Sequence, residues 1–99
     1  MHNETFGDYI KRARETLKLP LRKVAAYLDI DTSTLSKVEH GDRPASSDYL
    51  KLLAEILKLD LKEVQSKFIA DKINKDFGNM EHLTDGLKAA EQQIKKRKK

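Results

Sequence analysis

LPLRKVAAYLDIDTSTLSKVEHG, residues 19–41, is the stretch that decides the fold. We predict a helix over 20–28, because a proline is tolerated in the first turn of a helix, where its missing N–H has no partner to lose. The segment 29–31 interrupts the apolar spacing, and a second helix is predicted over 32–40. Gly41 marks its end, since glycine adopts a positive φ at little cost. The stretch therefore predicts two short helices joined by a tight turn.

On both sides of this stretch, apolar residues recur every three or four positions, the spacing that lines one face of an α-helix. Further helices are predicted over about 6–18, after the loop 42–46, from residue 61 to a stop at Gly78-Asn79, and over about 80–96. The expected class is all-α, since the sequence shows no alternating run typical of a strand. The expected caps of these helices are Thr5, Asp31 or Thr32, Ser46 or Ser47, and Asp60.

The size and composition of the chain limit the classes of protein that it fits. It has 99 residues and no cysteine, so we expect one domain with an appendage, without disulfides or Cys-ligated zinc. Residues 1–15 are charged and hold no apolar core of a secretory signal. No apolar run approaches the roughly 20 residues of a membrane span. We therefore expect a cytoplasmic protein.

Positive charge is concentrated toward the C-terminal end. Residues 1–60 carry ten Lys/Arg and ten Asp/Glu, whereas residues 61–99 carry ten Lys/Arg and six Asp/Glu. The five residues 95–99 are all cationic, and they raise the formal net charge from −1 to +4. Net charge alone therefore does not identify a partner, and the positions of particular residues have to decide.

Residues 19–41 resemble the helix-turn-helix of phage-repressor-type regulators, the Cro/C1 or XRE family. The resemblance extends over about residues 5–64, well over half of the chain. It implies a five-helix phage-repressor-like helix-turn-helix domain with a C-terminal helical extension. In such a domain a small residue, here Ala25, lets two helices cross closely, and Ile30 fills the turn between them. The residues that carry the match are Val24-Ala25, Leu28, Ile30, Ser33-Thr34-Leu35-Ser36, Val38-Glu39 and Gly41.

In such a domain the second helix of the pair enters the major groove of DNA, with its first turn and one side facing the bases. The resemblance places Thr32, Ser33, Ser36 and Lys37 on that side, as residues that read bases. The short hydroxyls suit either hydrogen-bond sense, and Lys37 can reach guanine O6 or N7. Because a good base contact discriminates by about 1–3 kcal/mol, we expect Lys37 to have the largest single effect.

Four other residues are expected to hold the DNA backbone. The resemblance implies that Arg22, Lys23, Thr34 and Arg43 contact phosphates. The family often has Gln at the position of Leu21, where the side chain helps to bind phosphate. Since Leu21 cannot do this, we expect Arg22, Lys23 or the backbone N–H groups at the helix start to replace it.

Glu39 is expected to be structural. The resemblance implies a partly buried ion pair between Glu39 and Arg14, with Arg12 as the alternative partner. The sequence shows no Ser–His–Asp order, glycine-rich phosphate loop or paired-carboxylate motif, so we predict no enzyme and no cofactor. The histidines lack the spacing of metal ligands, so surface positions and no metal site are expected for His2, His40 and His82.

We divide the chain into a DNA-binding domain over 1–64, a helical extension over 65–94 and a basic tail over 95–99. The apolar residues of the extension either fold back on the domain or join two copies; dimerisation is favoured, because regulators of this type usually bind two half-sites as dimers. The tail is predicted to be disordered, and either attracts DNA non-specifically or only solubilises the chain. The residues expected to dimerise are Phe68, Ile69, Ile73 and Phe77.

The expected function is that of a sequence-specific transcription regulator that binds a palindromic operator in double-stranded DNA as a homodimer. The short chain resembles controller proteins of restriction–modification systems and small phage-type repressors. Two alternatives give the extension another role. An antitoxin would hold a toxin with its C-terminal helices and use the helix-turn-helix to regulate its own synthesis, and an adaptor would mainly bind another transcription protein.

Overall fold

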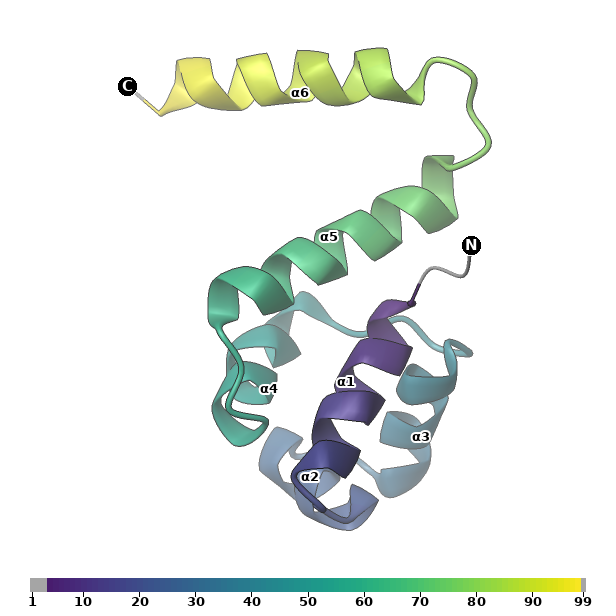
Figure 1. Cartoon of the computed structure of the whole chain (residues 1–99), viewed down its shortest axis with the longest axis vertical. Coiled ribbons are helices and arrows are strands. Elements are labelled where there is room, and N and C mark those ends of the chain that lie inside the picture. Colours follow the sequence, from purple (N-terminus) through teal and green to yellow (C-terminus); the bar gives the residue numbers. More distant parts are fainter. Residues whose placement is uncertain (1–3, 99) are drawn as a thin grey trace.

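Six α-helices build the described part of the chain, residues 4–98, in the computed structural model (Figure 1). No β-strand occurs within this range, and the predicted all-α class is confirmed. His2 and Lys99 lie outside the described residues. The helices are α1 (Phe6–Thr16), α2 (Leu21–Leu28), α3 (Thr32–His40), α4 (Leu50–Ile56), α5 (Leu61–Phe77) and α6 (Leu83–Arg97), and a 3-10 turn, η1 (Ser47–Tyr49), leads into α4.

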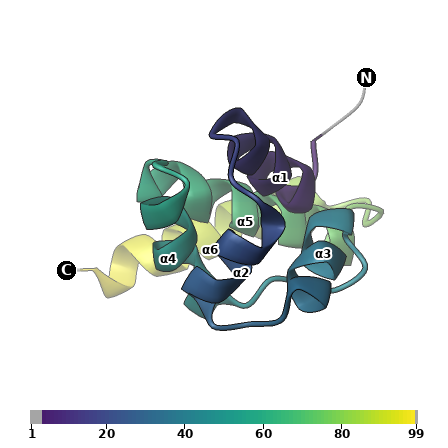
Figure 2. The same ribbon diagram turned by 90° about the horizontal axis from the view of Figure 1, so that it is seen from below.

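The first three helices begin and end at the residues that the local sequence favours. Thr5 caps α1, since its Oγ1 accepts a hydrogen bond from Asp8 N at 3.0 Å and Asp8 Oδ2 accepts one from Thr5 N at 3.3 Å. This reciprocal pair satisfies two N–H groups that a helix start leaves open. α2 and α3 lie side by side, joined by a turn in which Asp29 has a φ of 59° (Figure 2). Gly41 ends α3 with a φ of 81°, as predicted.

The other three predicted caps stand at the starts of α3, η1 and α5. Side chains make two of them, those of η1 and α5. Ser46 Oγ accepts from Asp48 N at 3.2 Å and so begins η1, and Asp60 Oδ1 accepts from Lys62 N at 3.2 Å at the start of α5. Asp31 occupies the cap position of α3, but its side chain makes no cap hydrogen bond. The start of α3 therefore keeps backbone N–H groups that no side-chain cap occupies.

One apolar core joins α1 to α4 and the beginning of α5. The helices cross so that the predicted apolar stripes of α1 to α4 meet in the interior, and the position of these stripes in the core is confirmed. Burying a side chain of this kind contributes about 1.5–3 kcal/mol. The buried apolar residues are Phe6, Tyr9, Ile10, Val24, Ala25, Leu28, Leu35, Val38, Leu50, Leu53, Ala54, Leu57 and Val64.

The N-terminal half of α5 belongs to this core. Val64 is fully buried, and the ring of Phe68 packs edge-on against Phe6 with 5.4 Å between the ring centroids. Tyr9 donates its hydroxyl to Glu63 Oε1 at 2.6 Å, and burial raises the pKa of Tyr9 above its ordinary value. α5 is thus fastened to α1 over its first two turns and runs on without a break across residues 64 and 65.

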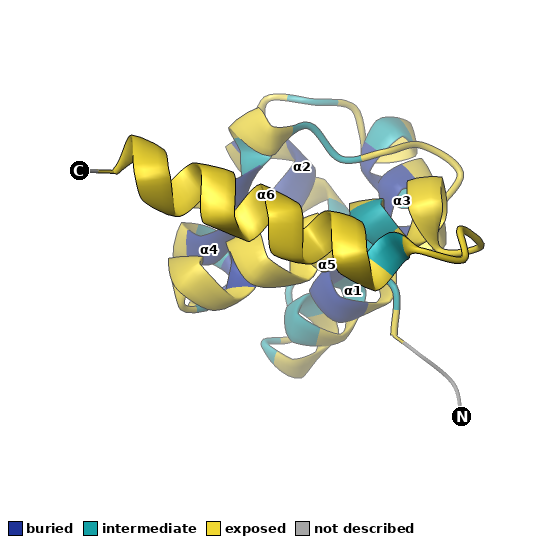
Figure 3. Cartoon of the chain, turned by 90° about the horizontal axis from the view of Figure 1, so that it is seen from above, coloured by how far each residue is buried: buried dark blue, intermediate teal, exposed yellow. Residues whose placement is uncertain are grey.

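α6 lies across α5 on the side away from α1 to α4, and nearly all of it is exposed (Figures 1 and 3). It begins at Leu83, later than the predicted start at residue 80, because residues 78–82 form turns instead. In these turns Met80 N donates to Phe77 O at 2.9 Å and Leu83 N donates to Met80 O at 3.3 Å. Neither α6 nor any other helix within residues 4–98 is long and apolar enough to cross a membrane.

The predicted disorder of the basic tail is wrong for Lys95–Arg97, which form the last turn of α6. Cations in this position interact favourably with the negative end of the helix dipole. Lys95 Nζ also lies 3.9 Å from Glu91 Oε2, one turn earlier on the same helix. The run of like charges is therefore compatible with a helix end, whereas composition alone favours disorder.

α1 comes very close to the end of α3 at Gly7. A Cβ atom placed on Gly7 would lie 2.4 Å from Glu39 O and 2.5 Å from Val38 O. Both neighbours are backbone atoms, so they cannot swing away as a side chain would. Gly7 therefore sets how close α1 comes to α3.

We predict that Gly7→Ala lowers the free energy of unfolding by about 1–3 kcal/mol, the usual cost of forcing an extra methyl group into a packed contact. Urea denaturation followed by circular dichroism measures the change. An unchanged transition midpoint would show that α1 and α3 separate at little cost.

Candidate nucleic-acid interface

One side of α3 is buried in the domain, and the other side faces the solvent. Leu35, Val38 and Glu39 point into the domain. The four predicted base-reading residues lie on the outer side, where Thr32, Ser33 and Lys37 are exposed and Ser36 is half-buried. Their spacing of three and four places them along one stripe of the helix. These residues form a short polar surface on α3, whose inner side packs against the core.

His40 continues this stripe, four residues after Ser36 and three after Lys37, and it is exposed. Its Nδ1 lies 2.7 Å from the carbonyl oxygen of Ser36. Because a carbonyl only accepts, Nδ1 carries the proton and Nε2 is the ring atom left to meet a ligand. From the sequence, only a surface position is expected for His40. Its spacing of four residues from Ser36 is the signal that places it on this face.

The start of α2 carries two of the predicted phosphate-binding residues. Arg22 and Lys23 are exposed in its first turn, and Pro20 provides no side-chain cap. A helix start has a partial positive charge, so the two cations and the backbone there favour an anion together. Leu21 is half-buried and packs against the core, which explains why an apolar residue serves at this position.

The other two predicted phosphate-binding residues belong to α3 and the loop that follows it. Arg43 is exposed in that loop and takes part in none of the ion pairs found among residues 4–98. Thr34 is half-buried, at the edge of the outer stripe. Exposed cations therefore stand at both ends of the helix pair, at the start of α2 and after the end of α3.

Arg14 and Glu39 form an ion pair behind α3. Arg14 Nε lies 2.8 Å from Glu39 Oε2 and Nη2 lies 3.1 Å from Oε1, a two-point contact in which the Glu39 side chain is only 3% exposed. Arg14 Nη1 also donates to Leu19 O at 2.9 Å. The hydrogen bonds that Arg14 donates to the Glu39 carboxylate raise the pKa of Arg14 above its ordinary value. The pair fixes the rotation of α3, because Glu39 is buried together with Leu35 and Val38 and its carboxylate is held by α1.

Arg12, the alternative partner, pairs instead with Glu4. Its Nε lies 2.7 Å from Glu4 Oε2 and its Nη2 lies 2.9 Å from Oε1. The Arg12 side chain is 61% exposed. The two arginines of α1 therefore make contacts of similar geometry in very different surroundings.

The residues expected to dimerise lie in two different environments. Phe68 packs against the core of its own protomer, which covers much of its apolar surface. Ile69 and Phe77 are 54% and 45% exposed, and Ile73 is half-buried at an apolar groove between α5 and α6. The unfilled apolar surface therefore begins after Phe68 and continues onto α6.

The basic end of α6 does not extend the α3 surface. α6 lies beyond α5, away from α2 and α3 (Figure 1), so Lys95–Arg97 do not join the exposed cations of the helix pair. Within residues 4–98, no group of three or more His, Asp and Glu side chains is placed to hold a metal ion.

The sequence matches the helix-turn-helix family over residues 10–64, more than half of the chain. The chain therefore belongs to the helix-turn-helix family, and the XRE-type resemblance of residues 19–41 is confirmed. It is similar to the HTH-type transcriptional repressor RghR of Bacillus subtilis (strain 168), with 32% identity over 68 residues. That match covers 65% of this chain and 48% of the relative, so the chain spans about half of the relative's length. A comparison with solved structures finds no match.

We predict that Arg14→Ala lowers the free energy of unfolding by about 3–5 kcal/mol, because it leaves the buried carboxylate of Glu39 without its partner. Arg12→Ala is the matched control: it removes the same side chain from the same helix, but its ion pair is exposed and the change in stability should be small. Thermal or urea denaturation measures both. Equal losses for the two variants would contradict a special role for the buried pair.

Proposed function

We propose that this chain is a DNA-binding transcription regulator that reads bases with α3. The observation that carries the proposal is the outer stripe of α3, which is polar and mostly exposed, while Leu35 and Val38 are buried in the core and Arg14 holds the buried Glu39. An α-helix fits the major groove of B-DNA, where base edges differ from pair to pair. The helix-turn-helix family and the repressor named among its relatives support this assignment.

The proposed division of labour follows from side-chain chemistry. Lys37, with its long cationic side chain, reaches guanine, while Thr32 and Ser33 make shorter contacts at the start of the helix. Arg22, Lys23 and Arg43 hold phosphates on either side and set the register of α3 without reading sequence. His40 joins them at the end of the stripe as a further contact. No reaction is proposed for the chain.

We further propose that the regulator acts as a homodimer through α5 and α6. Large apolar side chains stay exposed on these helices, among them Ile69, Phe77 and Leu87. A contiguous exposed apolar surface of this kind marks an interaction site in a monomeric chain. Pairing two copies would give two α3 helices, which suits a palindromic operator with half-sites about one helical turn apart.

The second candidate is that the same surface holds a different protein, as in an antitoxin or an adaptor. The exposed apolar side chains favour this as well, since they fit any partner with a complementary apolar face. The two candidates differ in the state of the purified chain: a regulator of the first kind is a dimer on its own, whereas the second kind stays a monomer until its partner is added.

We predict that Lys37→Ala weakens binding to a selected operator by about 5- to 150-fold, the range of one good base contact. Binding to random duplex of equal length should fall much less. Lys88→Ala, which removes an exposed lysine from α6, is the control and should leave both affinities unchanged. Fluorescence anisotropy at fixed salt measures them. Equal losses on operator and random DNA would remove Lys37 from the base-reading residues.

We predict that Leu87→Glu converts the dimer into a folded monomer, because it places a charge in the apolar surface of α6. Lys88→Glu introduces the same residue one position along the helix and should leave the dimer intact. Sedimentation velocity measures both. Phe68→Asp is a poorer test, since Phe68 packs on Phe6 and its loss would also disturb the core. A Leu87→Glu variant that remains dimeric would place the interface elsewhere.

A further inference from the structure

The apolar residues around α6 follow the alternating spacing of a coiled coil. Met80, Leu83, Leu87, Ala90 and Ile94 are separated by three, four, three and four positions. This is the repeat in which one helix packs lengthwise along another, with the side chains of each inserted between those of its neighbour. α5 does not cover this seam, because Met80, Leu87 and Ile94 are 62%, 42% and 43% exposed.

Gly86 lies beside the seam and has no explanation within one protomer. A Cβ atom added to it would meet nothing within 4 Å, and glycine is a poor residue for the interior of a helix. Gly86 lines the apolar groove together with Leu87 and Ala90. A glycine and an alanine four positions apart allow the backbone of another helix to come close at this point.

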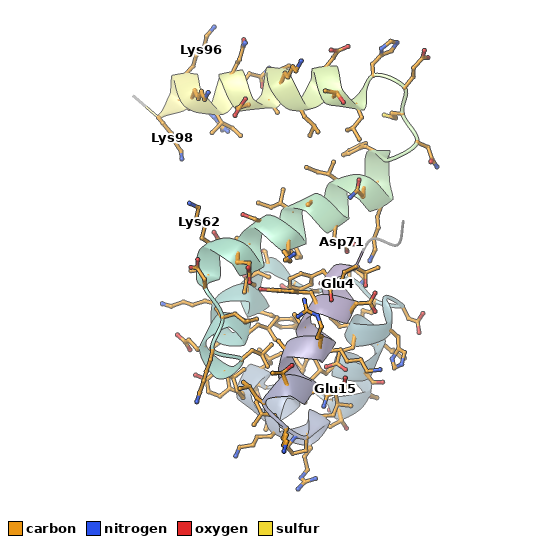
Figure 4. All side chains as sticks on the ribbon, in the orientation of Figure 1. Glu4, Glu15, Lys62, Asp71, Lys96 and Lys98 are labelled. Atoms are coloured by element: carbon orange, nitrogen blue, oxygen red, sulfur yellow. The ribbon has the colours of Figure 1, made fainter. Side chains whose placement is uncertain are left out.

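The charges of α6 are unlike at its two ends. Glu81 and Asp85 stand at its beginning, whereas Lys95 and Lys96 belong to its last turn. Figure 4 shows Lys96 and Lys98 at the free end of the helix. Two α6 helices side by side in the same direction would bring both cationic ends together. In opposite directions, the cationic end of each would lie beside the acidic beginning of the other.

We propose that α6 pairs in an antiparallel way with α6 of a second copy of this chain, crossing between Leu87 and Ala90. The proposal rests on the homodimer of the proposed function and adds its direction and register. With this centre, Leu83 of one copy lies opposite Ile94 of the other, and Leu87 lies opposite Ala90. Gly86 lies about 4 Å along the axis from this centre, within one turn of the crossing, where the lack of a side chain lets the two backbones approach.

An apolar groove between α5 and α6 borders the seam of α6, the row of apolar residues from Met80 to Ile94. Ile73 and Leu83 line it from the two helices, and Ile69 and Phe77 extend the apolar surface along α5. A second α6 laid along the seam would cover this surface as well. The occupant is therefore another amphipathic helix with cations at its end, and α6 of a second copy has both properties.

Cysteine cross-linking tests the direction and the register. The chain has no cysteine, so each introduced thiol is unique, and the substituted residues lie outside the core. A disulfide needs the two Cβ atoms about 3.8 Å apart. In the antiparallel pair, residue 94 of one copy is displaced from residue 94 of the other by about 16 Å along the axis, from a rise of 1.5 Å per residue.

We expect the double variant Leu83→Cys with Ile94→Cys to form a covalent dimer under mild oxidant, on a non-reducing gel. Each single variant should form no more covalent dimer than Lys88→Cys, whose thiol is placed away from the seam. Within one copy, residues 83 and 94 are too far apart along the helix to join.

Two results would overturn the proposal, and they differ in what else they remove. Efficient self-linking of both single variants, with a dimer in sedimentation, would mean that the helices run parallel, and the homodimer would stand. No cross-linking above the Lys88→Cys level by the double variant, with the unmodified chain sedimenting as a monomer, would remove the antiparallel pair and the homodimer together. The same variants bound to operator DNA report separately on base reading by α3.

Discussion

A single guanidinium group joins three segments of this protein. Arg14 extends from α1, forms two hydrogen bonds with Glu39 on the inner side of α3, and donates a third to the carbonyl of Leu19 between α1 and α2. Breaking a buried pair costs several kcal/mol because the remaining charge stays unpaired. Gly7 allows α1 to lie against the end of α3 in the first place. The direction in which Lys37 points depends on both contacts.

The chain divides its apolar residues between two purposes. Those of α1 to α4 and of the first turns of α5 are buried within one protomer and hold α3 rigidly. Most of those after Phe68 remain exposed, although they have the same regular spacing. A rigid α3 suits base reading, which requires side chains in fixed positions. An exposed seam suits association, which in turn brings two such helices to one DNA site.

Sequence predicts the features that depend on neighbouring residues. The cap at Thr5 and the helix end at Gly41 follow from local hydrogen bonds and local φ, and the structure contains both. It does not predict contacts that arise only when distant segments meet. The regular apolar spacing of α5 does not show that Phe68 packs against Phe6 whereas Ile69 and Phe77 stay exposed. The need for Gly7 appears only once α3 has been positioned against α1. The basic residues at the end of α6 are helical because cations are favourable near the negative end of the helix dipole. Composition alone does not show that they occupy this position.

The most direct measurement is selection of duplexes from a random pool by the full chain at moderate salt, followed by sequencing of the bound DNA. If two α3 helices read bases together, the selected duplexes share a two-fold symmetric motif whose half-sites lie about one helical turn apart. Binding that is strong only at low salt and enriches no motif would contradict base reading by α3, and would assign the attraction to phosphates alone.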